Sequence, residues 1–193
     1  MQKLIVLFLI LIYYTTPQSL AQVQCEGIYV TAADYSLGKL SYQSTHNKFC
    51  KLRVHELTRT ATIKLISKDT AITLLKNNVF GYRDNQKINY RFYNNKSYEM
   101  VSNSKSIMLY KTTLLTGNKG AETIDKFFFS ITTNSPLYAL TIQNLKNEFA
   151  NNTSFIAALD LYFKTNNELL NYDTFHKQYT LHYVYALTNK LSN

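Results

Sequence analysis

Short alternating segments, separated by polar turns, recur about every ten residues from Gly27 to Pro136. Residues 87–93 show the alternation most clearly. One set of side chains there is Ile88, Tyr90 and Phe92, and the other is Lys87, Asn89, Arg91 and Tyr93. Polar turns follow at 94–96 and 103–105, on either side of another strand-like segment. Because successive side chains of a strand point to opposite faces of a sheet, this rhythm predicts an antiparallel β-meander.

The apolar spacing changes to that of a helix after residue 140. Thr141 and Asn152 each precede an apolar run and are suited to cap a helix N-terminus. The second of these runs places on one helical face Phe155, Leu159, Tyr162 and Phe163. A short helix is predicted over 166–170, and a last helix over 175–188.

Strand-like segments first and helical segments last are the order of an α+β domain, in which helices cover a sheet. We predict an antiparallel β-meander in the N-terminal two thirds and packed helices in the C-terminal third. No flexible linker separates the halves, since the chain has only 5 Gly and 2 Pro. Residues 22–193 are therefore expected to form a single domain, mainly β over 22–140 and mainly helical over 141–193.

The first residues have the layout of a secretory signal peptide. Lys3 is followed by an unbroken apolar run over 4–14, about half the length that a transmembrane helix requires. Ser19 and Ala21 then supply the small residues that a signal peptidase recognises before its cut. We predict a signal peptide over 1–21 and an exported protein, periplasmic or extracellular, with no membrane span once the signal is removed. The alternatives are an uncleaved anchor and a lipoprotein.

The chain contains two cysteines, Cys25 and Cys50, and both lie in the part predicted to be exported. Thiols in such compartments are usually oxidised. A disulfide between them would close a loop of about 26 residues, which the chain-entropy estimate equates with roughly 3.5 kcal/mol of stability. We predict this internal bridge; the alternatives are two unpaired thiols, or Cys25 bridged to another protein.

Positive charge is concentrated in the middle of the chain. The whole chain has a formal net charge of +9, and residues 48–111 alone carry a net charge of +9. We predict a basic and aromatic binding face formed by Lys64, Lys87, Arg91, Tyr93 and Lys111. Its partner is expected to be a polyanionic glycan or lipid head groups. Nucleic acid is not expected, because Lys outnumbers Arg by 17 to 4 and no nucleic-acid motif is present. The alternative is a solvated face whose lysines protect strand edges.

Sequence motifs that carry catalysis or bind metals are missing. None of the four His lies three or four residues from another, and no G-x-S-x-G motif or phosphate-binding glycine loop occurs. We therefore predict a non-enzymatic binding or accessory protein without metal or cofactor, whose partner is a polyanion or an envelope protein. The alternative is an envelope hydrolase whose catalytic carboxylates or serine converge only in the fold.

Several segments resemble an uncharacterised family of secreted proteins from Bacteroidetes-type bacteria. These segments are GIYVTAADYSLGKLSY, VFGYRDNQKINYRFYNNKSYEMV, FFFSI, LTIQNLKNEFANNTSFIAALD and NELLNYDTFHKQYTLHYVYAL. The resemblance implies export, but it carries over no functional residue because the family has no assigned activity. It also implies O-glycosylation at Thr70, since Asp69-Thr70-Ala71 fits the acceptor pattern of such bacteria.

Overall fold

The computed structural model describes residues 26–43, 51–54, 60–66, 70–102, 104, 106–116 and 122–190. The strands, in chain order, are β1 (Gly27–Tyr29), β2 (Tyr42–Gln43), β3 (Lys51–Arg53), β4 (Thr62–Ile66), β5 (Ala71–Leu75), β6 (Gly81–Arg83), β7 (Asn89–Tyr93), β8 (Lys96–Met100), β9 (Met108–Thr116), β10 (Glu122–Ser130), β11 (Tyr138–Ala139), β12 (Tyr172–Asp173) and β13 (Gln178–Tyr179). The helices are α2 (Ala32–Ser36), α3 (Ile142–Glu148), α4 (Thr153–Tyr162) and α5 (Thr180–Lys190), with short 3-10 helices η1 (Lys76–Asn78) and η3 (Asn166–Leu170).

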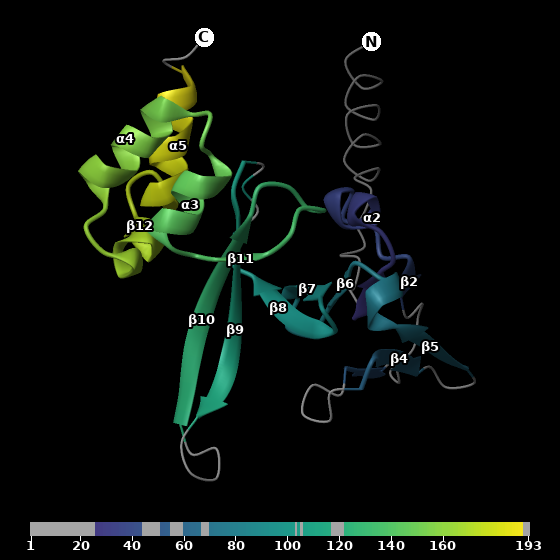
Figure 1. Ribbon diagram of the computed structural model, residues 1–193. Helices are drawn as coiled ribbons and strands as arrows, with labels where there is room; N and C mark the ends of the chain where they lie inside the picture. Colours follow the sequence, from purple (N-terminus) through teal and green to yellow (C-terminus); the bar gives the residue numbers. More distant parts are fainter. Residues whose placement is uncertain are drawn as a thin grey trace, which may run out of the picture.

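Eight strands form one antiparallel sheet in the order β11-β10-β9-β8-β7-β6-β1-β2. The strands from β6 to β11 are neighbours in the same order as in the chain, as a meander requires. Three of the four α-helices in the described part of the chain follow these strands in the C-terminal part (Figure 1). The predicted α+β class, with its antiparallel meander and C-terminal helices, is confirmed.

The strands between β2 and β6 form a second, three-stranded sheet in the order β3-β4-β5. Ile63 and Leu65 on β4 are buried. They pack on three side chains of the large sheet, Ile28, Tyr82 and Phe92. Because β1 pairs directly with β6, the strands β3, β4 and β5 cannot insert between β1 and β6. They stack on the face of the large sheet instead. The meander pattern could not distinguish this stacking from continuation of one sheet.

The large sheet has two distinct faces, which we call the packed face and the Arg91 face. Residues directly opposite one another on neighbouring strands share a face. On this basis the packed face contains Ile28, Tyr82, Tyr90, Phe92, Glu99, Leu109, Lys111 and Phe129. The Arg91 face contains Tyr29, Arg83, Asn89, Arg91, Tyr98, Tyr110 and Ser130. The predicted alternation of side chains along β7 is thereby confirmed.

Two covers lie on the packed face. The three-stranded sheet covers its β1–β7 end, and the C-terminal helices cover the β9–β10 end (Figure 1). The hydrophobic core under the helices joins Leu109 and Phe129 to buried residues of α3, α4 and α5, including Leu145, Phe155 and Leu181. The Glu99–Lys111 ion pair lies on the same face, with 3.1 Å between carboxylate and ammonium.

The helix starts agree with the predicted caps at two positions. The Thr141 hydroxyl accepts the backbone N–H of Asn144, and the Asn152 side chain accepts that of Phe155. One predicted face of α4 needs correction, because Tyr162 is 44% exposed. The other three residues of that face, Phe155, Leu159 and Phe163, are buried as predicted, and Phe163 ends the helix.

The last helix starts later than the sequence pattern predicts. Residues 172–179 form the short β12–β13 hairpin, and α5 begins at Thr180. The Asp173 carboxylate accepts the backbone N–H groups of Phe175 and His176, and Lys177 has a positive φ of 52°. This side-chain turn competes with helix formation, which is why the predicted helix over 175–188 is wrong in its first turn.

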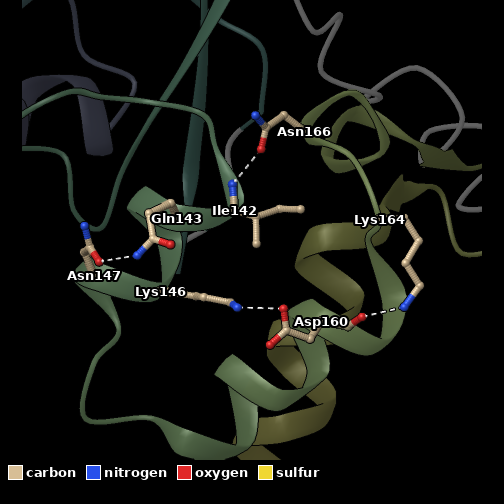
Figure 2. Close-up of polar contacts among 7 residues, drawn as sticks. All are labelled: Ile142, Gln143, Lys146, Asn147, Asp160, Lys164 and Asn166. Carbon is tan, nitrogen blue, oxygen red and sulfur yellow. Dashed lines mark hydrogen bonds and ion pairs between the residues drawn. The ribbon is translucent and has the colours of Figure 1, made fainter.

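Polar contacts connect α3 to the two segments that pack beside it (Figure 2). Lys146 and Lys164 both reach Asp160 on α4: the Lys146 ammonium lies 2.6 Å from its carboxylate, and Lys164 donates to its backbone carbonyl at 2.7 Å. At the start of α3, the Asn166 side chain accepts the backbone N–H of Ile142 at 2.9 Å. The contacts of Lys164 and Asn166 satisfy helix-end backbone groups, and the Lys146–Asp160 pair links α3 to α4.

Candidate functional site

Of the five residues predicted to form one basic and aromatic face, the structure brings together only Arg91 and Tyr93. Lys64 is exposed on β4, in the three-stranded sheet. Lys87 is exposed in the turn between β6 and β7, where it has a φ of 66°. Tyr93 is half-buried on the Arg91 face, and Lys111 lies on the packed face. The structure therefore separates the three lysines from one another and from the Arg91–Tyr93 pair.

Arg91 is an internal residue, with only 5% of its surface exposed. Its guanidinium donates to the Tyr110 hydroxyl at 3.2 Å, the Ser130 hydroxyl at 3.4 Å and the Ser135 carbonyl at 2.8 Å. It also lies 5.7 Å from the ring centroids of Phe80, Tyr93 and Tyr110. Because hydrogen-bond acceptors and aromatic rings replace its water, Arg91 is not part of an exposed binding face.

Lys111 is also committed to a partner within the chain. Its ammonium pairs with the Glu99 carboxylate on the neighbouring strand β8. The hydrogen bond to Glu99 raises the pKa of the Lys111 side chain, so the ammonium form is favoured. A lysine whose positive charge is paired with a carboxylate contributes little to the attraction of an external anion.

An exposed basic surface does occur on the outer face of the three-stranded sheet. Arg53 on β3 lies directly opposite Lys64 on β4, and both are exposed. We call this pair, with Lys51 two residues before Arg53, the basic patch. The other described members of this outer face are Thr62, Ile66, Ala71, Thr73 and Leu75. None of these is acidic, so no carboxylate of the described residues faces the Arg53–Lys64 pair across the strands.

Acidic groups occur at one end of the basic patch. Glu26 and Asp84 line a cavity of about 270 Å³ together with Lys51, at the edge of β3. The Glu26 carboxylate accepts the backbone N–H of Leu52 at 2.7 Å, which fixes it beside that strand. Lys51 therefore lies near negative charge, and Arg53 and Lys64 are the centre of the patch. Sequence reasoning identified Lys64 but missed Arg53, although the alternation in Lys51-Leu52-Arg53 is a usable signal.

The predicted modification sites fall at or outside the limits of the described residues. Thr70 is exposed immediately before β5, but Asp69 of the predicted acceptor pattern lies outside the described residues. Cys25, Cys50 and the signal peptide over 1–21 also lie outside them. O-glycosylation at Thr70, the Cys25–Cys50 disulfide and the signal peptide all stay predictions.

One serine–histidine contact bears on the alternative of a hydrolase. The Nε2 atom of His182 lies 3.3 Å from the Ser102 hydroxyl and 2.8 Å from the Ile107 carbonyl. A carbonyl oxygen only accepts, so Nε2 must carry the proton and cannot take one from Ser102. Burial also lowers the pKa of His182, which keeps the imidazole neutral. This pair is therefore not arranged as nucleophile and general base.

A second histidine pairs with a carboxylate on the molecular surface. The His176 Nδ1 atom lies 2.6 Å from the Asp173 carboxylate, and this hydrogen bond lowers the pKa of Asp173. In the part of the chain that the structure describes, no serine, threonine or cysteine side chain hydrogen-bonds His176. The same part contains no cluster of three or more His, Cys, Asp or Glu suited to hold a metal ion.

None of the described helices has the length and apolar character needed to cross a membrane. Comparison of the chain with protein-family models, with curated proteins and with solved structures finds no match. The resemblance to secreted Bacteroidetes-type proteins therefore stays a prediction.

Proposed function

We propose that the chain is an exported, non-enzymatic binding protein whose basic patch binds an acidic polysaccharide. The observation that carries this proposal is the direct cross-strand pairing of Arg53 with Lys64. Like charges directly opposite one another destabilise a sheet. An anionic group bound between them relieves this repulsion, so binding and sheet stability are coupled.

The place of Lys64 argues against a role in edge protection alone. Lysines on edge strands prevent unwanted strand pairing, but β4 is the central strand of its sheet. Thr62 and Thr73 lie on the same outer face and add hydroxyl groups that suit contacts with sugar hydroxyls. These features favour a glycan-binding site over a charged surface that only contacts solvent.

Export is the part of the proposal that rests on the N-terminal sequence. The apolar run after Lys3 and the small residues Ser19 and Ala21 support passage across a membrane. A protein outside the cytoplasm meets acidic polysaccharides rather than nucleic acid. Lipid head groups offer similar charges, and they are therefore included as a separate arm of the test.

Heparin affinity chromatography tests the proposal. The protein should be retained at low salt and released at moderate salt, because exposed charges are screened within about 8 Å at physiological ionic strength. The double variant Arg53→Gln, Lys64→Gln should lose most of this retention. The matched control, Lys96→Gln with Lys126→Gln, removes two exposed charges from other strands and should be retained more strongly than the patch variant.

Equal loss of retention in the two double variants would contradict the proposal, since net charge alone would then explain binding. Binding to anionic phospholipid vesicles without retention on heparin would assign the patch to lipid head groups. Release of shortened chains during incubation with the polysaccharide would favour the alternative hydrolase.

A further inference from the structure

A cavity of about 550 Å³ opens on the Arg91 face, on the opposite side of the large sheet from the basic patch. Its floor is the sheet, and α2 and the loop after β10 form its walls. Figure 1 shows this loop running from the top of β10 toward α2. The described residues that line the cavity are Tyr29, Tyr35, Ser36, Gly38, Arg83, Asn89, Ser104, Met108, Thr132 and Thr133.

The lining combines aromatic rings, neutral polar groups and a single charge. Tyr29 and Tyr35 meet edge to face, with 5.5 Å between ring centroids. Burial raises the pKa of Tyr35 to about 12, so its hydroxyl keeps its proton at neutral pH. Hydroxyl and amide groups come from Ser36, Ser104, Thr132, Thr133 and Asn89. No described residue of the lining carries a carboxylate, and Arg83 is therefore an uncompensated positive charge in the cavity.

Arg83 lacks the acceptors that its position calls for. Its buried Nε atom has no hydrogen-bond partner, and among the described residues no carboxylate lies within salt-bridge distance. Across the strands, Arg83 faces Gly27 on one side, which offers no side chain, and Asn89 on the other. The Asn89 side-chain oxygen already accepts the Tyr29 hydroxyl at 3.0 Å. A buried donor without a partner is destabilising, and more so when it is charged.

We propose that this cavity binds a small hydroxyl-bearing ring that carries one oxyanion, either a carboxylate or a phosphate. The planar guanidinium of Arg83 presents paired N–H donors that match two oxygens of such a group. The centroid of the Tyr29 ring lies 6.0 Å from the guanidinium carbon of Arg83, and this cation–π contact positions the guanidinium at the cavity wall. Tyr35, which is half-buried, offers its ring for packing on the ligand ring, and the serine and threonine hydroxyls bond the ligand's hydroxyl groups. The volume lies within the range of sites for small molecules.

Isothermal titration with three probes tests the proposal: glucuronate, glucose 6-phosphate and glucose. The acidic probes should bind at least about tenfold more tightly than glucose, which corresponds to one charge-assisted pair. Arg83→Gln should remove this preference, and Arg83→Lys should weaken it because the fork of donors is lost. Lys126→Gln is the matched control, since it removes an exposed positive charge from β10, outside both the cavity lining and the basic patch, and should leave all three affinities unchanged.

The comparison of the two acidic probes distinguishes a carboxylate ligand from a phosphate ligand. Binding of neither acidic probe to the wild-type protein would overturn the proposal, whatever the variants do. Equal binding of glucose and the acidic probes, unaffected by Arg83→Gln, would show that the cavity does not distinguish charged from neutral ligands and would also overturn the proposal. Modification of Arg83 by phenylglyoxal gives a second measurement on the wild-type protein. The acidic probes should protect Arg83 and glucose should not, and lack of protection by the acidic probes would contradict the proposal.

Discussion

Two arginines on the same sheet face have opposite surroundings. Arg91 donates to three oxygens, whereas the Nε of Arg83 has no partner. The partners of Arg91 lie 19, 39 and 44 residues away along the chain, on Tyr110, Ser130 and Ser135. The sequence could predict which face each side chain occupies, because alternation is local. It could not predict burial, since that depends on chain segments far from either arginine.

Replacement of each arginine should separate their roles. Arg91→Met should lower the free energy of unfolding by about 2–3 kcal/mol, because hydrogen bonds to a charged group are lost and their acceptors stay buried. Arg83→Met should change stability little or raise it, since the removed donor has no partner. Urea unfolding of the two variants measures the difference. Equal destabilisation by the two substitutions would contradict the different roles assigned to Arg91 and Arg83.

At the scale of elements, short-range hydrogen bonds decide what the sequence can predict. The caps at Thr141 and Asn152 were predictable because each side chain bonds a backbone N–H three residues later. The β12–β13 hairpin was not, because the turn at Asp173 overrides the helical spacing of the apolar residues around it. The three-stranded sheet also depends on a long-range event, the pairing of β1 with β6.

The docking of α5 on the strand region should depend on pH through His182, which is 8% exposed and donates to the Ile107 carbonyl. Burial lowers the pKa of His182 below its ordinary 6.5, so the unfolded chain takes up a proton at higher pH than the folded chain. The contribution of neutral, buried His182 to the free energy of unfolding is therefore complete above about pH 6.5 and is lost as the pH falls below that value.

His182→Gln should show a smaller fall in melting temperature between about pH 7.5 and 5.5 than the wild type, because glutamine keeps the N–H donor but does not titrate. Circular dichroism melts at a series of pH values measure this. Carboxyl groups with lowered pKa, such as Asp34 and Glu168, act at more acidic pH and do not interfere. Parallel curves for the two proteins would contradict the role of His182.

At the scale of the molecule, one sheet face carries two separate covers. The three-stranded sheet and the helices each enclose their own core against the packed face. The order of strands and helices predicted the α+β class, but it could not assign the cations to these layers. Arg53 and Lys64 reach solvent because they lie on the outer side of a cover, whereas Lys111 lies on the packed face with Glu99.

Export can be tested on the whole molecule by N-terminal sequencing of the protein recovered outside the cytoplasm. The mature chain should begin at Gln22, because Ser19 and Ala21 form the small-residue pattern before the cut. A product that retains Met1, or one that begins at a lipidated Cys25, would contradict the predicted signal peptide.

The bond between Arg91 and Ser135 has a consequence for the rate and entropy of ligand entry. Ser135 belongs to the loop that carries Thr132 and Thr133 over the cavity, and the Ser130 hydroxyl donates to the Thr132 carbonyl at 2.7 Å in the same loop. The wall formed by this loop is therefore held in place before any ligand arrives. A ligand that enters it loses little free energy to the ordering of protein segments. Its association therefore needs no ordering of this loop.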